Sequence, residues 1–134
     1  DEISAQITII VNNWEKLMAA NLIHHLNETL VDIGDGSTWL GTETASCTGN
    51  LELCQDYSKH YSKMRGFAAG LQYNRYMLIS NADLQAVYSL LGVAPLWIGD
   101  VGAESLLQFK ADLILARDIL SLVYSFDENL ILEW

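Results

Sequence analysis

The sequence predicts an all-α fold, an up-down bundle of about four helices in which the first and last helices are long. Three observations support this class. Apolar residues recur at steps of three and four along most of the chain, and breaker-rich segments separate these stretches. No alternating apolar–polar pattern of strand length is present. At 134 residues the chain has the size of one domain, so we expect a single helical-bundle domain over residues 1–134.

The first expected element is a long helix over residues 3–33. Its early apolar stripe advances in steps of four, three, four and three residues, through Ile3, Ile7, Ile10, Trp14 and Leu17. We expect the bundle to cover this stripe, and Gly34 is placed to end the helix. Residues 34–50 are rich in glycine and small polar residues, which indicates an unusually long connection.

A second helix is expected over residues 51–79, with one apolar face along its length. Gly66 and Gly70 form a Gly-x-x-x-Gly pattern in this stretch. In a membrane helix the pattern would mark a dimer face, but here it predicts close approach of a neighbouring helix.

The rest of the chain predicts two further helices. A capping box at Ser80–Asp83 begins a shorter helix that reaches Leu91. Residues 92–102 contain the only proline and are unusually apolar for a loop, and a last long helix begins near Ala103. The final ten residues either continue this helix or break from it at Asp127 and pack as a short terminal element.

Two cysteines, Cys47 and Cys54, flank a short Gly-Asn-containing segment. Their spacing favours a disulfide in the loop between the first and second helices, because such a loop can close without strain. The alternative is a reduced pair with one cysteine in the core. A disulfide implies an oxidising compartment, so we expect a periplasmic or extracellular location. Because the sequence begins at Asp1, we expect a processed chain or a part of a longer one.

The composition limits the partners. Acidic residues number 17 against 7 basic ones, and the net charge of −10 argues against nucleic acid and against an anionic membrane surface. We therefore expect either a small anionic molecule, bound at a local basic site, or a basic protein. No apolar run approaches the roughly 18 residues that cross a bilayer, so membrane helices, if present, lie outside this sequence. A homodimer is a further alternative, because bundles with wide apolar stripes often pair.

Basic and aromatic residues gather late in the second expected helix, at Arg65, Tyr73, Arg75 and Tyr76. Arg75 falls on or beside the apolar stripe, where a guanidinium must find an anionic or carbonyl partner. The residues therefore predict a pocket for a small carboxylate between helices. The alternative is a partly buried arginine paired with one of the 17 acidic side chains.

The apolar segment before the last helix offers a candidate partner-binding surface at Leu96, Trp97 and Ile98. An exposed tryptophan is a frequent hot spot of protein interfaces. The alternative is that the segment folds back as a lid over the end of the bundle.

No pattern nominates catalytic residues, a cofactor or a metal. His24 and Glu28 stand four residues apart on one helix face, but two ligands do not make a site, and we interpret them as a polar helix flank. We therefore expect a non-catalytic extracytoplasmic helical domain for ligand or signal recognition, of the sensor type. The alternative is a small acidic secreted binder resembling an inhibitor or immunity protein, and a helical hydrolase is a third, unsupported choice.

Overall fold

The structure is a computed structural model that describes residues 1–34, 44–74 and 77–134. It confirms the predicted all-α class, because the described residues form helices and contain no strand. The elements in chain order are α1 (Glu2–Ile33), α2 (Leu51–Leu71), α3 (Asn81–Leu91), α4 (Ile98–Tyr124) and a short 3₁₀ helix, η1 (Leu130–Glu133). Among residues 1–34, 44–74 and 77–134, none of the helices has the length and hydropathy of a membrane-spanning segment.

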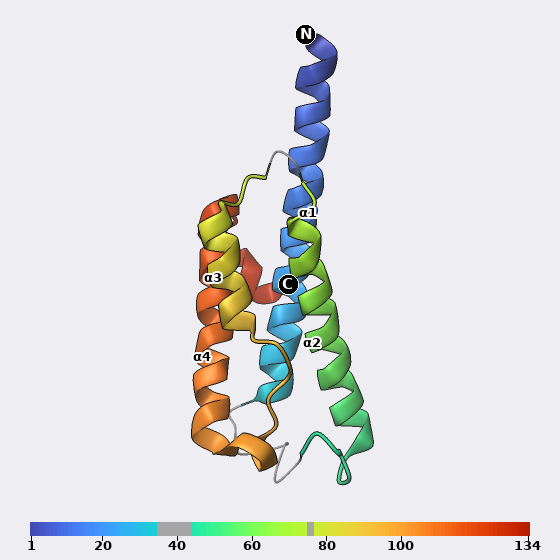
Figure 1. Cartoon of the computed structure of the whole chain (residues 1–134), viewed down its shortest axis with the longest axis vertical. Coiled ribbons are helices and arrows are strands. Elements are labelled where there is room, and N and C mark those ends of the chain that lie inside the picture. The colour runs from blue at the N-terminus through green and yellow to red at the C-terminus, as the bar shows by residue number, and fades with distance from the viewer. Residues whose placement is uncertain (35–43, 75–76) are drawn as a thin grey trace.

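The four helices run alternately up and down and form one elongated bundle (Figure 1). In the bundle α1 lies along α2 and also contacts α4, while α3 lies along α4. The apolar faces of all four helices meet in one core. Its fully buried members include Leu22, Ile23, Leu26, Tyr57, Met64, Leu71, Leu91, Leu106 and Leu113.

Local signals set three helix ends as the sequence predicts. Gly34 ends α1 with a positive φ of 63°, a conformation that favours glycine. At the start of α3, the Ser80 hydroxyl accepts a hydrogen bond of 3.0 Å from the backbone N–H of Asp83. Gly92 ends the same helix with a φ of 68°.

The second helix is shorter than predicted, because it ends at Leu71 and not at Ile79. The backbone N–H groups of Leu78 and Ile79 donate instead to the buried carboxylate of Glu15 in α1. A carboxylate that accepts backbone N–H bonds stabilises this non-helical connection at the expense of the helix. The predicted extension of the helix to residue 79 is therefore wrong, and the cause is a contact distant in sequence.

The last helix begins at Ile98, five residues before the predicted start at Ala103. Its first turn starts at Ile98, but Gly102 has the non-helical angles φ 80° and ψ 163° and bends the chain there. The regular helix therefore starts near the predicted Ala103. It ends at Tyr124, where Ser125 has a left-handed φ of 55°.

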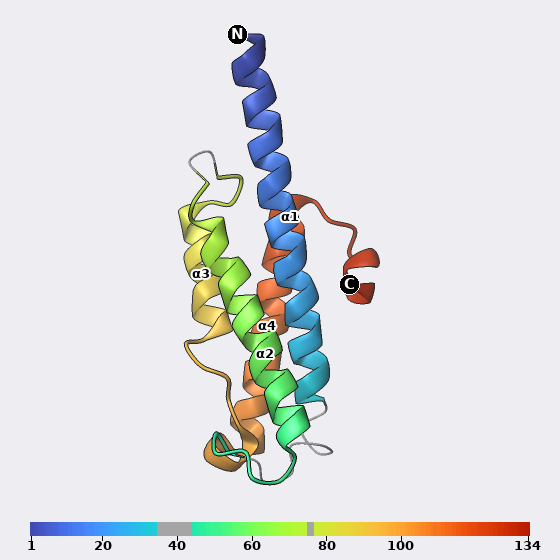
Figure 2. The ribbon, with the colours of Figure 1, turned by 90° about the vertical axis from the view of Figure 1, so that its right-hand side faces the viewer.

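The final ten residues break from α4 and do not continue it, which settles the two sequence alternatives. After Ser125 the chain turns back and η1 lies against α1 (Figure 2). Asn27 of α1 holds this tail, since its amide Nδ2 donates to the backbone oxygens of Ile131 and Trp134 at 2.6 and 3.3 Å.

The beginning of α1 projects beyond the other helices (Figure 1). We call residues 2–14 the projecting segment and residues 15–33 the packed segment. The early stripe is exposed, at 69% for Ile3, 50% for Ile7, 66% for Ile10, 44% for Trp14 and 60% for Leu17. The expectation that the bundle covers this stripe is therefore wrong. No other helix in the described part of the chain extends along residues 2–14, and Leu17 lies on a solvent-exposed face of the packed segment.

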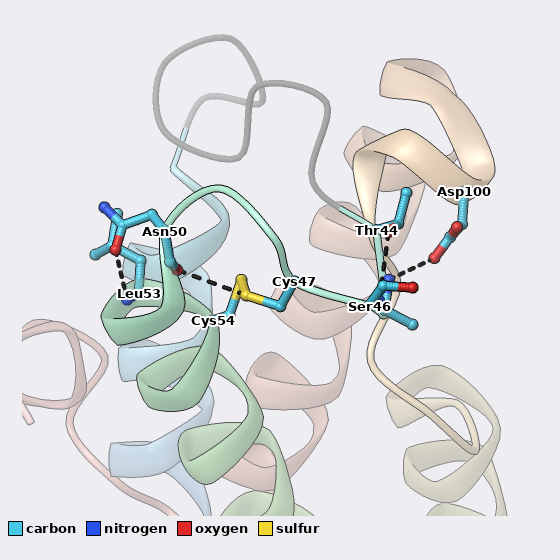
Figure 3. Close-up of a disulfide and its surroundings, with 8 residues drawn as sticks. Thr44, Ser46, Cys47, Asn50, Leu53, Cys54 and Asp100 are labelled. Carbon is cyan, nitrogen blue, oxygen red and sulfur yellow. Dashed lines mark hydrogen bonds between the residues drawn. A yellow bond between two sulfur atoms is a disulfide. The ribbon is translucent and has the colours of Figure 1, made fainter.

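The predicted disulfide joins Cys47 to Cys54 across a Cα–Cα distance of 6.1 Å. Cys47 lies in the connection between α1 and α2, and Cys54 is buried in the first turn of α2 (Figure 3). The same connection is tied to α4, because the backbone N–H of Ala45 donates to Asp100 at 2.9 Å. A disulfide suggests an oxidising environment.

Candidate functional site

All three histidines of the chain gather around one carboxylate where α1 and α2 meet. Glu28 Oε2 lies 2.7 Å from His25 Nδ1 and 3.5 Å from His24 Nε2. The same oxygen lies 3.5 Å from Nε2 of His60, which α2 contributes. On its other ring nitrogen, His60 Nδ1 lies 2.7 Å from Asp32 Oδ2. We call these five residues the histidine cluster.

Helical spacing assembles one side of the cluster and packing supplies the other. Glu28 follows His25 by three positions and Asp32 follows Glu28 by four, so these side chains share one face of α1. α2 brings His60 to that face. The ring of Phe67, also in α2, stacks on His25 with a centroid distance of 5.5 Å and an interplanar angle of 15°. The stacked ring of Phe67 and the hydrogen bond to Glu28 therefore both restrict the imidazole of His25.

Burial and the contacts within the cluster shift the pKa values of three of its groups. Burial lowers the pKa of His25, although its hydrogen bond to Glu28 acts in the opposite direction. Burial acts to raise the pKa of Glu28, but the hydrogen bond to His25 and the nearby His60 and His24 together bring this pKa below its usual value. Burial raises the pKa of Asp32 despite its hydrogen bond to His60.

These groups have the chemistry of a metal site. His24, His25 and Glu28 each offer one ligand atom, and the three atoms lie within 4.8 Å of one another. The sequence does not predict His60 at this place, because no motif surrounds it and the spacing of His24 and Glu28 concerns one helix only. The sequence around His60 contains no motif that indicates which face of which other helix its side chain will contact.

A cavity of about 260 Å³ opens beside the cluster and is closed on one side by the C-terminal tail. Glu28, Asp32 and His60 line it from the helices, and Leu132, Glu133 and Trp134 line it from the tail. The tail reaches this position because Asn27, one residue before Glu28, holds it. An ion or small molecule can therefore reach the cluster from solvent.

The predicted anion pocket is only partly within the described residues. Arg75 and Tyr76 lie outside them. The Arg65 guanidinium carbon lies 5.4 Å from the centroid of the Tyr88 ring, in a cation–π contact, and Tyr73 is 77% exposed. The structure gives Arg65 an aromatic partner, and anion binding at this place stays a prediction.

The predicted partner-binding segment folds back against the bundle. Trp97 is only 6% exposed, and its ring meets that of Tyr57 edge-on at a centroid distance of 5.0 Å. Leu96 and Ile98 are half-buried. Trp97 is therefore not an exposed anchor, because it fills the end of the core. Partner binding through the neighbouring residues stays a prediction.

Sequence reasoning missed a buried carboxylate at the boundary of the two segments of α1. Glu15 is fully buried and accepts hydrogen bonds from the Tyr124 hydroxyl at 2.7 Å, from the backbone of Leu78 and Ile79, and from the Asn74 amide. Burial, together with this carboxylate, raises the pKa of Tyr124. The available signal was helical spacing, since Glu15 precedes buried Ala19 and Leu22 by four and seven residues.

Comparisons with known proteins add no identity to these observations. No protein-family model matches the chain, and neither the curated proteins nor the solved structures gave a match. The class that the fold and the site define is a disulfide-bonded, all-α bundle with a projecting first helix and a surface histidine cluster.

Proposed function

We propose that the chain is a non-catalytic recognition domain of the sensor type that works in a periplasmic or extracellular compartment. One observation carries the proposal. The helix α1 is continuous from Glu2 to Ile33. It bears four of the five residues of the histidine cluster in its packed segment, and the exposed stripe from Ile3 to Trp14 in its projecting segment. A ligand that bridges α1 and α2 at the cluster can bias their relative position. A stiff helix then transfers this small displacement to its other end.

The occupant that we propose for the exposed stripe is a second copy of this chain. The stripe Ile3, Ile7, Ile10, Trp14 and Leu17 has the mean spacing of 3.5 residues that two coiled helices need. The positions that flank such a seam are uncharged, namely Ser4, Gln6, Val11, Asn13, Met18 and Ala20. Although each copy has a net charge of −10, no charged side chain at these flanking positions opposes the pairing. In a parallel pair each apolar side chain faces its own equivalent.

Sedimentation velocity tests this proposal. Over protein concentrations from about 1 to about 200 µM, the wild-type chain should shift from monomer to dimer. Ile10→Lys should keep the chain monomeric, because it places two ammonium groups in the seam. Ile9→Lys is the matched control, since Ile9 is also exposed but lies off the seam. A wild-type chain that is monomeric throughout, or an Ile9→Lys variant that is as defective as Ile10→Lys, would contradict the proposal.

A second candidate function is the acidic binding module. It is favoured by the net charge of −10 and by a groove of about 520 Å³ between α3 and α4, where Glu104 and Asp112 line the walls. In this function the working unit is a monomer bound to a basic protein. An oligolysine peptide serves as the probe. The double variant Glu104→Gln, Asp112→Asn should weaken its binding by about fivefold, against no loss for the distant Glu2→Gln.

A further inference from the structure

We infer that the histidine cluster binds a divalent transition-metal ion of the zinc or copper type, with Glu28, His24, His25 and His60 as its ligands. This inference names the ligand class of the proposed recognition domain and in that sense rests on the proposed function. Three features of the cluster support it: the arrangement of the donor atoms, the groups that hold them and the access from solvent.

The donor atoms are already close to the separation that a metal imposes. In a tetrahedral zinc site with metal–ligand distances of about 2.0–2.1 Å, neighbouring ligand atoms lie about 3.4 Å apart. His24 Nε2 and His60 Nε2 each lie 3.5 Å from Glu28 Oε2, and His25 Nδ1 lies 2.7 Å from it. The ligand atoms of His24, His25 and Glu28 lie within 4.8 Å of one another, and His60 approaches this group through Glu28. The set comes from two helices, so the ion would join α1 to α2.

The cluster also has the outer support typical of metal sites. A ligating histidine commonly donates its second ring N–H to a carboxylate, which directs the free nitrogen at the metal. His60 has this arrangement, because its Nδ1 lies 2.7 Å from Asp32 Oδ2 and its Nε2 faces Glu28. Asp32 is therefore a positioning residue. The stacked ring of Phe67 also limits the rotation of His25.

The donor types select the kind of ion. Three imidazoles with one carboxylate suit zinc, copper or nickel, whereas calcium and magnesium prefer an all-oxygen shell. The adjoining cavity, which Glu133 also lines, gives the ion a path from solvent. The acidic character of the whole chain raises the local concentration of cations.

Isothermal titration calorimetry of the metal-free chain with ZnCl₂, with MgCl₂ as the comparison ion, tests the inference. We expect one zinc ion per chain with a Kd of about 1 µM or lower and no binding of magnesium. Glu28→Gln and His60→Ala should each weaken zinc binding by about 100-fold, and Asp32→Asn by about tenfold. Glu52→Gln, an exposed carboxylate on α2, is the matched control and should bind as the wild type.

A second readout keeps the test independent of folding. Circular dichroism should show that Glu28→Gln retains the helical content, and zinc should raise the thermal midpoint of the wild type but not of this variant. Co²⁺ bound to the wild type should give the visible absorption of a tetrahedral site. The inference is overturned if zinc does not bind at one ion per chain, or if Glu28→Gln binds it unchanged. Zinc binding by a chain that never pairs would instead uphold the metal site and refute the sensor proposal.

Discussion

The two segments of α1 belong to one continuous helix and have similar apolar patterns, yet they have opposite environments. In the packed segment Ile23 and Leu26 are fully buried, whereas Ile7 and Ile10 in the projecting segment are half or more exposed. Periodicity therefore shows that a helix has an apolar face, but it does not show what covers that face. The cover depends on the length of the other helices, and in this chain they end before the projecting segment.

The largest expected effect is at the boundary between the two segments. Glu15→Ala should lower the free energy of unfolding by about 4 kcal/mol, because it leaves buried N–H and O–H donors without their acceptor. Urea denaturation measures this loss. Glu104→Ala removes an exposed carboxylate and should change stability by less than about 0.5 kcal/mol. Similar values for both variants would show that Glu15 does not anchor the fold.

A matched pair of isoleucine substitutions measures the contrast between the segments directly. Ile23→Ala removes a fully buried side chain and should cost about 3 kcal/mol of stability. Ile10→Ala removes an exposed one and should change the stability of the monomer by less than about 0.5 kcal/mol. Urea denaturation at about 1 µM keeps the chain monomeric for this comparison. Equal losses would mean that the projecting segment is covered within the monomer.

Reduction of the disulfide should lower the stability of the bundle without affecting the projecting segment of α1. For the short loop that Cys47–Cys54 closes, chain entropy predicts a loss of at most about 2.5 kcal/mol. Because the disulfide lies at the opposite end from the projecting segment, pairing of two chains should be unchanged (Figure 1). Urea denaturation and sedimentation of the chain with and without a reductant measure both effects. Loss of pairing on reduction would contradict this independence.

The smallest expected effect distinguishes the two glycines of α2. Gly66 has open space around it, so Gly66→Ala should stabilise the chain by up to about 1 kcal/mol through helix propensity. At Gly70 an added Cβ would overlap the terminal methyl of Met18 in the packed segment, which must then move. Gly70→Ala should therefore gain less. Thermal denaturation compares the stability of the two variants. An equal gain in stability would show that Met18 moves aside for the added methyl group without a cost in free energy.

Local sequence predicted most of the fold. The cap at Ser80, the stop at Gly34 and the disulfide depend on residues that are near one another in the chain, so the pattern contains the information. The end of α2 was missed because its cause, Glu15, lies more than 60 residues away from the backbone N–H groups whose hydrogen bonds it accepts. Such a contact is visible only after the helices have packed.

The candidate site could be predicted only in part for the same reason. Helical spacing placed His24 beside Glu28, but the register of α2 against α1 decides whether His60 joins them. For Trp97, composition showed a large apolar ring without showing whether it turns outward or into the core beside Tyr57. Residues 75 and 76, which belong to the predicted anion pocket, lie outside the described part of the chain.

Glu15 has a mechanical consequence for α1. It accepts hydrogen bonds from Tyr124 at the end of α4 and from the backbone that leads into α3, so we expect any tilt of α1 to turn about this point. At 1.5 Å of rise per residue, Glu28 lies about 20 Å from this point on one side and Ile3 about 18 Å on the other. The two lever arms are nearly equal. A movement of the histidine cluster by one ångström should therefore swing the tip of the helix by about the same amount in the opposite direction.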